Sequence, residues 1–145
     1  MSNDTSTKLD LALQAHDFFV KEKWTREQSA GLIANIEAES AFDHQAVGDG
    51  GQAFGICQWH PDRQAGFQRQ FGYSIKDADY VAQLAFVVFE LSNAEQLAGR
   101  ALRGTTTADE AGRVICRLYE RPDDPQGQVR RRRGALAQEW FDRLP

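Results

Sequence analysis

Cysteine, histidine and long apolar runs are all scarce in this sequence of 145 residues. Two cysteines, Cys57 and Cys116, are too few for a disulfide framework, so we expect two small buried side chains, with a single disulfide as the alternative. Three histidines and these cysteines give no zinc-type spacing, and neither a metal nor another cofactor is expected. The longest apolar run, residues 84–89, falls far short of the roughly 20 residues of a membrane helix, which argues against membrane insertion.

An excess of positive charge is also absent. The chain has 17 Lys and Arg residues against 21 Asp and Glu residues, a formal net charge of −4. This balance excludes attraction of the whole molecule to nucleic acid or to anionic membranes, so any contact with a polyanion has to be local. The polar first ten residues lack the apolar core of a signal peptide, and we therefore expect no Sec signal and delivery by another route.

With 41% hydrophobic residues, the chain has enough apolar side chains for one folded domain. We expect a flexible tail over residues 1–7 and a single domain over residues 8–145. Helix-initiating capping boxes begin at Thr25 and Thr107. The apolar spacing predicts a mainly α fold with about six helices and a short glycine-rich hairpin or loop near residues 45–58. The helices are expected over residues 9–20, 25–40, 63–71, 79–97, 107–119 and 126–144.

Two carboxylates stand at the end of the second predicted helix. Glu37 and Glu39 lie where the helix dipole disfavours an anion, and no basic residue follows within one turn, so we expect a carboxyl group there to hold its proton. Two residues apart, the pair diverges by about 200° around the helix axis, so one side chain can face solvent while the other faces a cleft. Glu39, at the helix exit, is the better candidate for an acid that protonates a glycosidic oxygen.

A glycine-rich segment with aromatic residues follows Glu39. Phe42, Phe54 and Trp59 offer apolar surface that can desolvate the acid and stack on a sugar face. Asp49, within Gly-Asp-Gly-Gly, can return opposite the helix end as a base, because inverting glycosidases place their two carboxyls roughly 6.5–9.5 Å apart. The competing interpretations are a surface glutamate, a turn-forming aspartate and a packed tryptophan.

Four short motifs extend this pattern: N-x-x-x-E-S-x-F, G-D-G-G-x-x-x-G, Q-W and an aromatic residue followed by E-R-P. They resemble the phage tail lysozyme domain family, which is related to goose-type lysozymes and soluble lytic transglycosylases in the lysozyme-like superfamily. The resemblance covers roughly residues 10–143 and is most specific in its first three motifs. The matching residues are Asn35, Glu39, Ser40, Phe42, residues 48–51, Gly55, Gln58, Trp59 and residues 119–122.

The resemblance implies a lysozyme-like fold, peptidoglycan as the substrate and the β-1,4 bond between N-acetylmuramic acid and N-acetylglucosamine as the target. It carries Glu39 over as the catalytic acid, and Ser40, Gln58 and Trp59 as residues that line the sugar cleft. Asp49 is assigned as the second catalytic carboxylate on spacing alone.

Tyr119 and Glu120 are further candidates for substrate binding. Glu120 competes with Asp49 for the orientation of a water molecule. Alternatively, Glu120 pairs with Arg121 and fixes the turn before Pro122. The second carboxylate is therefore Asp49, Glu120 or neither.

Two alternatives to a muramidase stay open. A lytic transglycosylase needs one glutamate, because the 6-hydroxyl of muramic acid attacks and leaves a 1,6-anhydro end, whereas hydrolysis needs a positioned water and favours a second carboxylate. In a different class, a non-catalytic glycan-binding or structural tail module keeps the cleft without turnover.

Residues 130–133 are four successive arginines in an otherwise acidic chain. They span more than one helical turn and cannot share one face, so we expect a solvated face or a local docking point for wall polymer or a carrier protein. We expect a monomer that acts on the cell wall after phage lysis, virion delivery or specialised secretion, without nucleic acid as a partner. A secreted effector would be expected to have an immunity protein.

Overall fold

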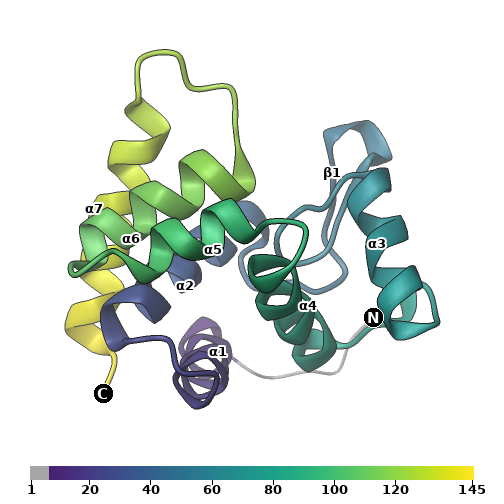
Figure 1. The fold of residues 1–145 in the computed structure, drawn as a ribbon, viewed down its shortest axis with the longest axis horizontal. Coiled ribbons are helices and arrows are strands. Elements are labelled where there is room, and N and C mark those ends of the chain that lie inside the picture. The colour runs from purple at the N-terminus through teal and green to yellow at the C-terminus, as the bar shows by residue number, and fades with distance from the viewer. Residues whose placement is uncertain (1–6) are drawn as a thin grey trace.

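Seven α-helices and a two-stranded antiparallel sheet make up residues 7–145, the part of the chain that the computed structural model describes (Figure 1). The expected mainly α class with a small glycine-rich hairpin is confirmed. The elements are α1 (Lys8–Lys21), α2 (Arg26–Ser40), β1 (Val47–Gly48), η1 (Asp49–Gly51), β2 (Ala53–Phe54), α3 (Pro61–Phe71), η2 (Ile75–Asp77), α4 (Tyr80–Ser92), α5 (Gln96–Arg103), α6 (Ala108–Val114), η3 (Ile115–Glu120) and α7 (Gln128–Arg143). Here η1 and η2 are short 3-10 helices, and η3 is a π-helix.

Threonine hydroxyls begin three of the helices. Thr25 accepts the amide of Gln28, whose side chain in turn accepts the amide of Thr25, so the predicted capping box is present. Thr107 accepts the amide of Glu110 at the start of α6. Thr7, which we expected to belong to the flexible tail, caps α1, and the rest of that predicted tail lies outside the described residues.

The helix predicted over residues 79–97 is two helices. The α-helical conformation stops at Asn93, where φ is −133° and ψ is −103°, and α5 begins at Gln96. The backbone then folds α5 back against the end of α4, where a Cβ atom on Gly99 would collide with the carbonyl oxygen of Leu91. The apolar periodicity continues through the break, which is why the sequence pattern did not locate it.

The tightest packing joins α2, α6 and α7. Small residues permit the close approach, since a Cβ on Gly31 of α2 would lie 2.5 Å from the Cβ of Ala111 in α6. In the same way, a Cβ on Gly112 would lie 2.6 Å from the carbonyl oxygen of Arg133 in α7. This packing sets the C-terminal end of α2 beside the middle of α7.

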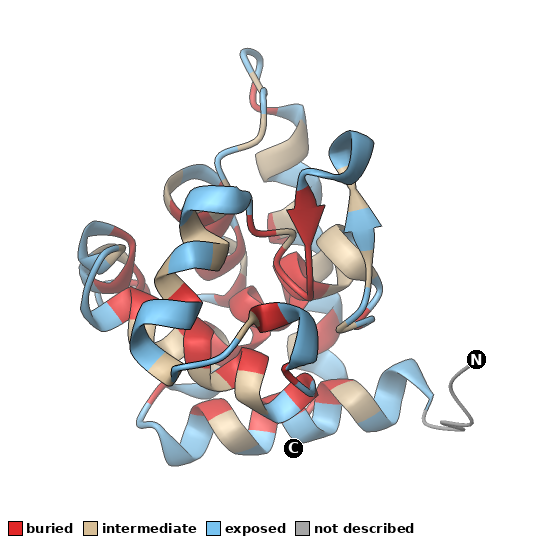
Figure 2. Ribbon diagram, turned by 90° about the vertical axis from the view of Figure 1, so that its right-hand side faces the viewer, coloured by how far each residue is buried: buried red, intermediate tan, exposed pale blue. Residues whose placement is uncertain are grey.

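The hairpin pairs Val47 with Phe54 and Gly48 with Ala53. Strand β2 is buried, whereas β1 is more exposed (Figure 2). Gln83, fully buried in α4, accepts the amide of Ile56 and donates to the carbonyl of His44. The hairpin is therefore fixed to α4, on the opposite side of the molecule from α6 and α7 (Figure 1).

Within residues 7–145, no helix combines the length and apolarity required to cross a lipid bilayer.

Candidate active-site cleft

A cleft of about 700 Å³ opens where three parts of the chain meet. The end of α2 supplies Glu39, the hairpin and the start of α3 supply residues between 49 and 63, and the end of η3 with the segment after it supplies residues 120–123. Of the residues singled out in the sequence, Glu39, Asp49, Gln58 and Glu120 line this cleft together. The carboxyl groups of Glu39, Asp49 and Glu120, from distant parts of the sequence, thus share one cleft, to which Asp62 and Asp123 add two more.

Glu39 lies at the last turn of α2, with its side chain 20% exposed. Its Oε2 accepts a hydrogen bond from Nη2 of Arg133 at 3.0 Å, and Arg133 also donates to Oδ1 of Asn35 at 2.7 Å. Asn35 is held in turn by the carbonyls of Gly31 and Gly112. No basic residue follows Glu39 within one turn of the sequence, but the fold supplies a basic partner from α7, 94 residues away.

Glu120 ends η3, a π-helix, and both of its carboxyl oxygens are buried without a hydrogen-bond partner in the described structure. Burial raises the pKa of Glu120 well above its ordinary value, and the neighbouring carboxylate of Glu39 raises this pKa further, against the lowering effect of Arg63 and Arg133. The predicted pairing with Arg121 is wrong, because Arg121 bonds to Glu95 of the α4–α5 connection. The surroundings of Glu120, at the edge of the cleft, thus favour the protonated form of its carboxyl group.

Asp49 and Gln58 come from the glycine-rich segment. The Oδ2 of Asp49 lies 3.2 Å from Nε2 of His60, and both side chains are more than half exposed. Gln58 donates from Nε2 to the carbonyls of Ala46 and Gly55, so its amide closes the hairpin while its side chain lines the cleft.

Trp59, Tyr119 and Ser40 do not reach the cleft. Trp59 is 0% exposed and Tyr119 is 1% exposed, so the expected stacking of Trp59 on a sugar and direct substrate contact by Tyr119 are wrong. Ser40 donates to the carbonyls of Ile36 and Ile56, which ties the end of α2 to the loop after β2. These three residues support the walls of the cleft from behind.

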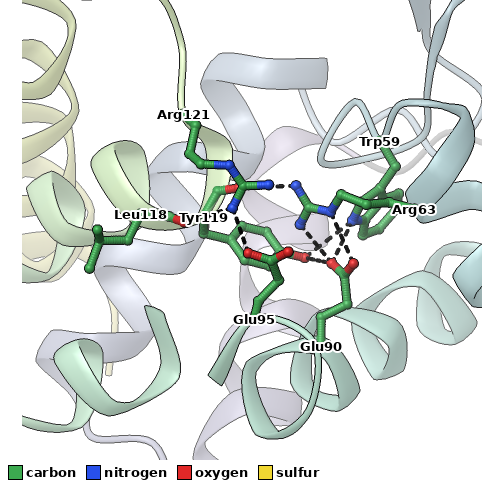
Figure 3. A network of polar contacts seen from close by, with 7 residues as sticks. All are labelled: Trp59, Arg63, Glu90, Glu95, Leu118, Tyr119 and Arg121. Atoms are coloured by element: carbon green, nitrogen blue, oxygen red, sulfur yellow. Dashed lines mark hydrogen bonds and ion pairs between the residues drawn. The ribbon is translucent and has the colours of Figure 1, made fainter. Parts of the chain in front are cut away.

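A buried polar network lies behind one wall (Figure 3). Glu90 of α4 accepts hydrogen bonds from the indole of Trp59 at 2.9 Å, the hydroxyl of Tyr119 at 2.6 Å and two nitrogens of Arg63 at 2.7 and 3.0 Å. Arg63 also donates to the carbonyl of Tyr119. Burial opposes the charge of Arg63, but Tyr119 and Glu90 outweigh it, and the pKa of Arg63 is raised. The network joins α3, α4 and η3 around one carboxylate.

Backbone strain gathers around the same cleft. Within the described part of the chain, six residues other than glycine have positive φ, and five of them lie in or next to the cleft-forming segments. Such residues cost of order 1–3 kcal/mol each and cluster at functional sites. The five are Ala41, Phe42, Asp49, Gln58 and Arg121.

Sequence reasoning did not find Arg63, Gln83, Glu90 or Arg133 as parts of the site. A usable signal existed for Glu90 and Gln83, which are polar residues inside the apolar stretch that forms α4. The arginine run divides as helical geometry requires: Arg133 turns inward to Glu39, while Arg130 pairs with Asp124. Cys57 and Cys116 are buried free thiols, so the disulfide alternative is wrong.

A family model described as phage tail lysozyme matches residues 10–144, nearly the whole chain.

Proposed function

The chain belongs to the phage tail lysozyme family, and from this membership we propose that it is a muramidase whose proton donor is Glu39. The family places the chain among peptidoglycan-degrading, lysozyme-like proteins. The proposed target is the β-1,4 bond between N-acetylmuramic acid and N-acetylglucosamine. Glu39 donates a proton to the glycosidic oxygen as positive charge develops at C1 of the muramic acid.

The observation that carries this proposal is the position of Glu39 in a cleft large enough for saccharide rings and lined by further carboxyl groups. Only Oε2 of Glu39 accepts a hydrogen bond within residues 7–145, so Oε1 is available to a ligand in the cleft. The chain from Asn35 through Arg133 to Glu39 fixes the side chain's direction. Such support from behind is what a proton donor needs for a constant geometry.

Asp49 is the proposed base that activates water. Glu120 is the weaker candidate for this role, because burial and the Glu39 carboxylate raise its pKa and favour its protonated form, which cannot accept the water's proton. Asp49 is exposed to solvent, faces the cleft and can be oriented by His60. Gln58, on the same wall, is the proposed polar contact for a sugar substituent.

The protein is proposed to act on the wall as a monomer. Delivery by a virion, by phage lysis or by specialised secretion brings it to the glycan strands, and an effector delivered in this way would meet an immunity protein at the cleft.

Digestion of purified peptidoglycan tests the proposal. Mass spectrometry of the released muropeptides is expected to show reducing muramic acid ends. Products with 1,6-anhydro ends would show that the protein is a lytic transglycosylase and not a hydrolase. Absence of released fragments, from protein that is folded by circular dichroism and sediments with the glycan, would contradict catalysis and indicate a glycan-binding module.

A further inference from the structure

Glu39 presents a chemical difficulty as a proton donor. The contact between its Oε2 and Arg133 is an ion pair, which is made by the ionised carboxylate. Arg133 is only 11% exposed, so solvent screens this pair little. A general acid must nevertheless carry a proton when the substrate is in place. A second acid in or near the cleft can supply that proton.

Glu120 is a carboxylic acid that lines the cleft and can supply this proton. Its carboxyl group lies on the same cleft as Glu39, and its two oxygens are removed from solvent without receiving a hydrogen bond from the described residues. An ionised carboxylate without a donor is very costly in such surroundings, whereas a neutral carboxyl group is tolerated. The buried side chain thus stores a proton beside the ionised Glu39.

The four charged groups that act most strongly on Glu120 balance one another. Glu39 from α2 and Glu90 from α4 are negative, while Arg63 from α3 and Arg133 from α7 are positive. These four charges sum to zero when Glu120 is neutral. The thiols of Cys57 and Cys116 and the phenol of Tyr119 also lie near Glu120, and burial raises the pKa of each. The same cleft is lined by further titratable groups, those of Asp49, His60, Asp62, Arg121 and Asp123.

We propose that Glu39 and Glu120 share a single proton, and that Glu120 supplies it to Glu39 for glycosidic cleavage. Glu120 is thus a positioning residue for the proton, and Glu39 is the catalytic residue. This inference rests on the proposed function of Glu39 as the donor.

The transfer conserves charge and protons. The O–H bond of the Glu120 carboxyl group breaks, and an O–H bond forms on the Glu39 carboxylate. The negative charge moves in the opposite direction, from Glu39 to Glu120. Arg133 stabilises both states, because it pairs with ionised Glu39 and also favours the ionised form of Glu120. The sum of charges stays at zero throughout.

The first experiment needs no catalytic activity. Carbon-13 NMR of labelled glutamate carboxyls, with the Glu120 signal assigned from its loss in Glu120→Gln, follows each group through a pH titration. The pKa of Glu120 is expected well above the ordinary value of about 4.3, and to fall by about one unit or more in Glu39→Gln. Glu37→Gln is the matched control, because Glu37 lies on the same helix and bonds to Trp140. An ordinary pKa for Glu120, or one that Glu39→Gln leaves unchanged, would overturn the shared proton.

The second experiment measures kcat/KM on soluble peptidoglycan fragments against pH. In the wild type, the basic limb reports loss of the last proton from the pair. In Glu120→Gln, Glu39 has to bind its own proton beside Arg133, so the basic limb is expected to move to lower pH by about one unit or more. Glu120→Asp keeps a carboxyl group and is expected to restore part of the wild-type limb.

The two experiments separate the shared proton from the proposed function of Glu39 as the donor. A uniform loss of rate in folded Glu120→Gln, without movement of the limb, would overturn the proton supply and leave Glu39 as the donor. A wild-type protein without lytic activity would contradict the proposed function, while the NMR titration would still decide whether the two carboxyls share a proton.

Discussion

Replacement of Glu90 by alanine is expected to destabilise the protein more than any other single change to the polar network. Glu90 is 3% exposed and accepts four hydrogen bonds, two of them from Arg63. Alanine leaves a guanidinium group that is 14% exposed without its counter-ion, which costs about 3–5 kcal/mol for a buried pair. It also removes the acceptor from Trp59 and Tyr119, but these losses are not additive.

We therefore expect a loss of about 4 kcal/mol in the free energy of unfolding, against a total of roughly 5–15 kcal/mol for a domain. Glu90→Gln keeps the shape and one acceptor oxygen, so a smaller loss than for alanine is expected, although the guanidinium of Arg63 still lacks a counter-ion. Urea unfolding followed by circular dichroism at 222 nm measures both values.

A double-mutant cycle isolates the ion pair. Arg63→Met removes the cation, and in its presence Glu90→Ala is expected to cost about 2 kcal/mol less than in the wild type, since no charge is then left unpaired. A cost below about 1 kcal/mol for Glu90→Ala alone, or strict additivity of the two changes, would refute the reasoning that this network holds α3, α4 and η3 together.

Three further predictions concern packing, pH and catalysis. Gly31→Ala puts a Cβ 2.5 Å from that of Ala111 and should cost about 1–3 kcal/mol by thermal unfolding, whereas Gly104→Ala, whose Cβ meets nothing nearer than 3.5 Å, should be close to neutral. Wild-type stability should fall as pH rises from about 4.3 towards the raised pKa of Glu120, because the folded state binds one more proton than the unfolded state in this range. At pH 7, Glu120→Gln should therefore be more stable than the wild type by about 1.4 kcal/mol for each unit by which the pKa is raised. Urea unfolding at pH 7 and below about pH 4 measures this difference, which should disappear at the lower pH. Asp49→Asn should lower the rate of muropeptide release by at least roughly 10²-fold if Asp49 is the base, and an unchanged rate would remove it from that role.

The local features of the fold could be predicted from the sequence. The capping residues Thr25 and Thr107 begin helices where expected, because a cap depends on residues three positions apart. The glycine-rich segment forms the expected hairpin. The cleft does bring together Glu39, Asp49, Gln58 and Glu120, which motif spacing selected without knowledge of the packing.

The environment of each side chain could not be predicted, because distant segments create it. Arg133 reaches Glu39 only because α2 and α7 pack closely over glycines. The orientation of Trp59 follows from its backbone bonds to Phe54 and the bond of its indole to Glu90. The carboxyl group of Glu120 is buried in the fold, and the residues around position 120 in the sequence do not indicate this burial. The types of residue in the site were therefore predictable, but their exposure and charge partners were not.

The most direct test of the central claim compares two glutamates of one helix. Glu39→Gln and Glu37→Gln are nearly isosteric changes two residues apart, and Glu37 bonds to Trp140 rather than lining the cleft. On purified peptidoglycan, with equal folding verified by thermal unfolding, Glu39→Gln is expected to lower the rate of muropeptide release by at least roughly 10²-fold while Glu37→Gln keeps a rate near that of the wild type. A Glu39→Gln protein that releases muropeptides as fast as the wild type would contradict the account.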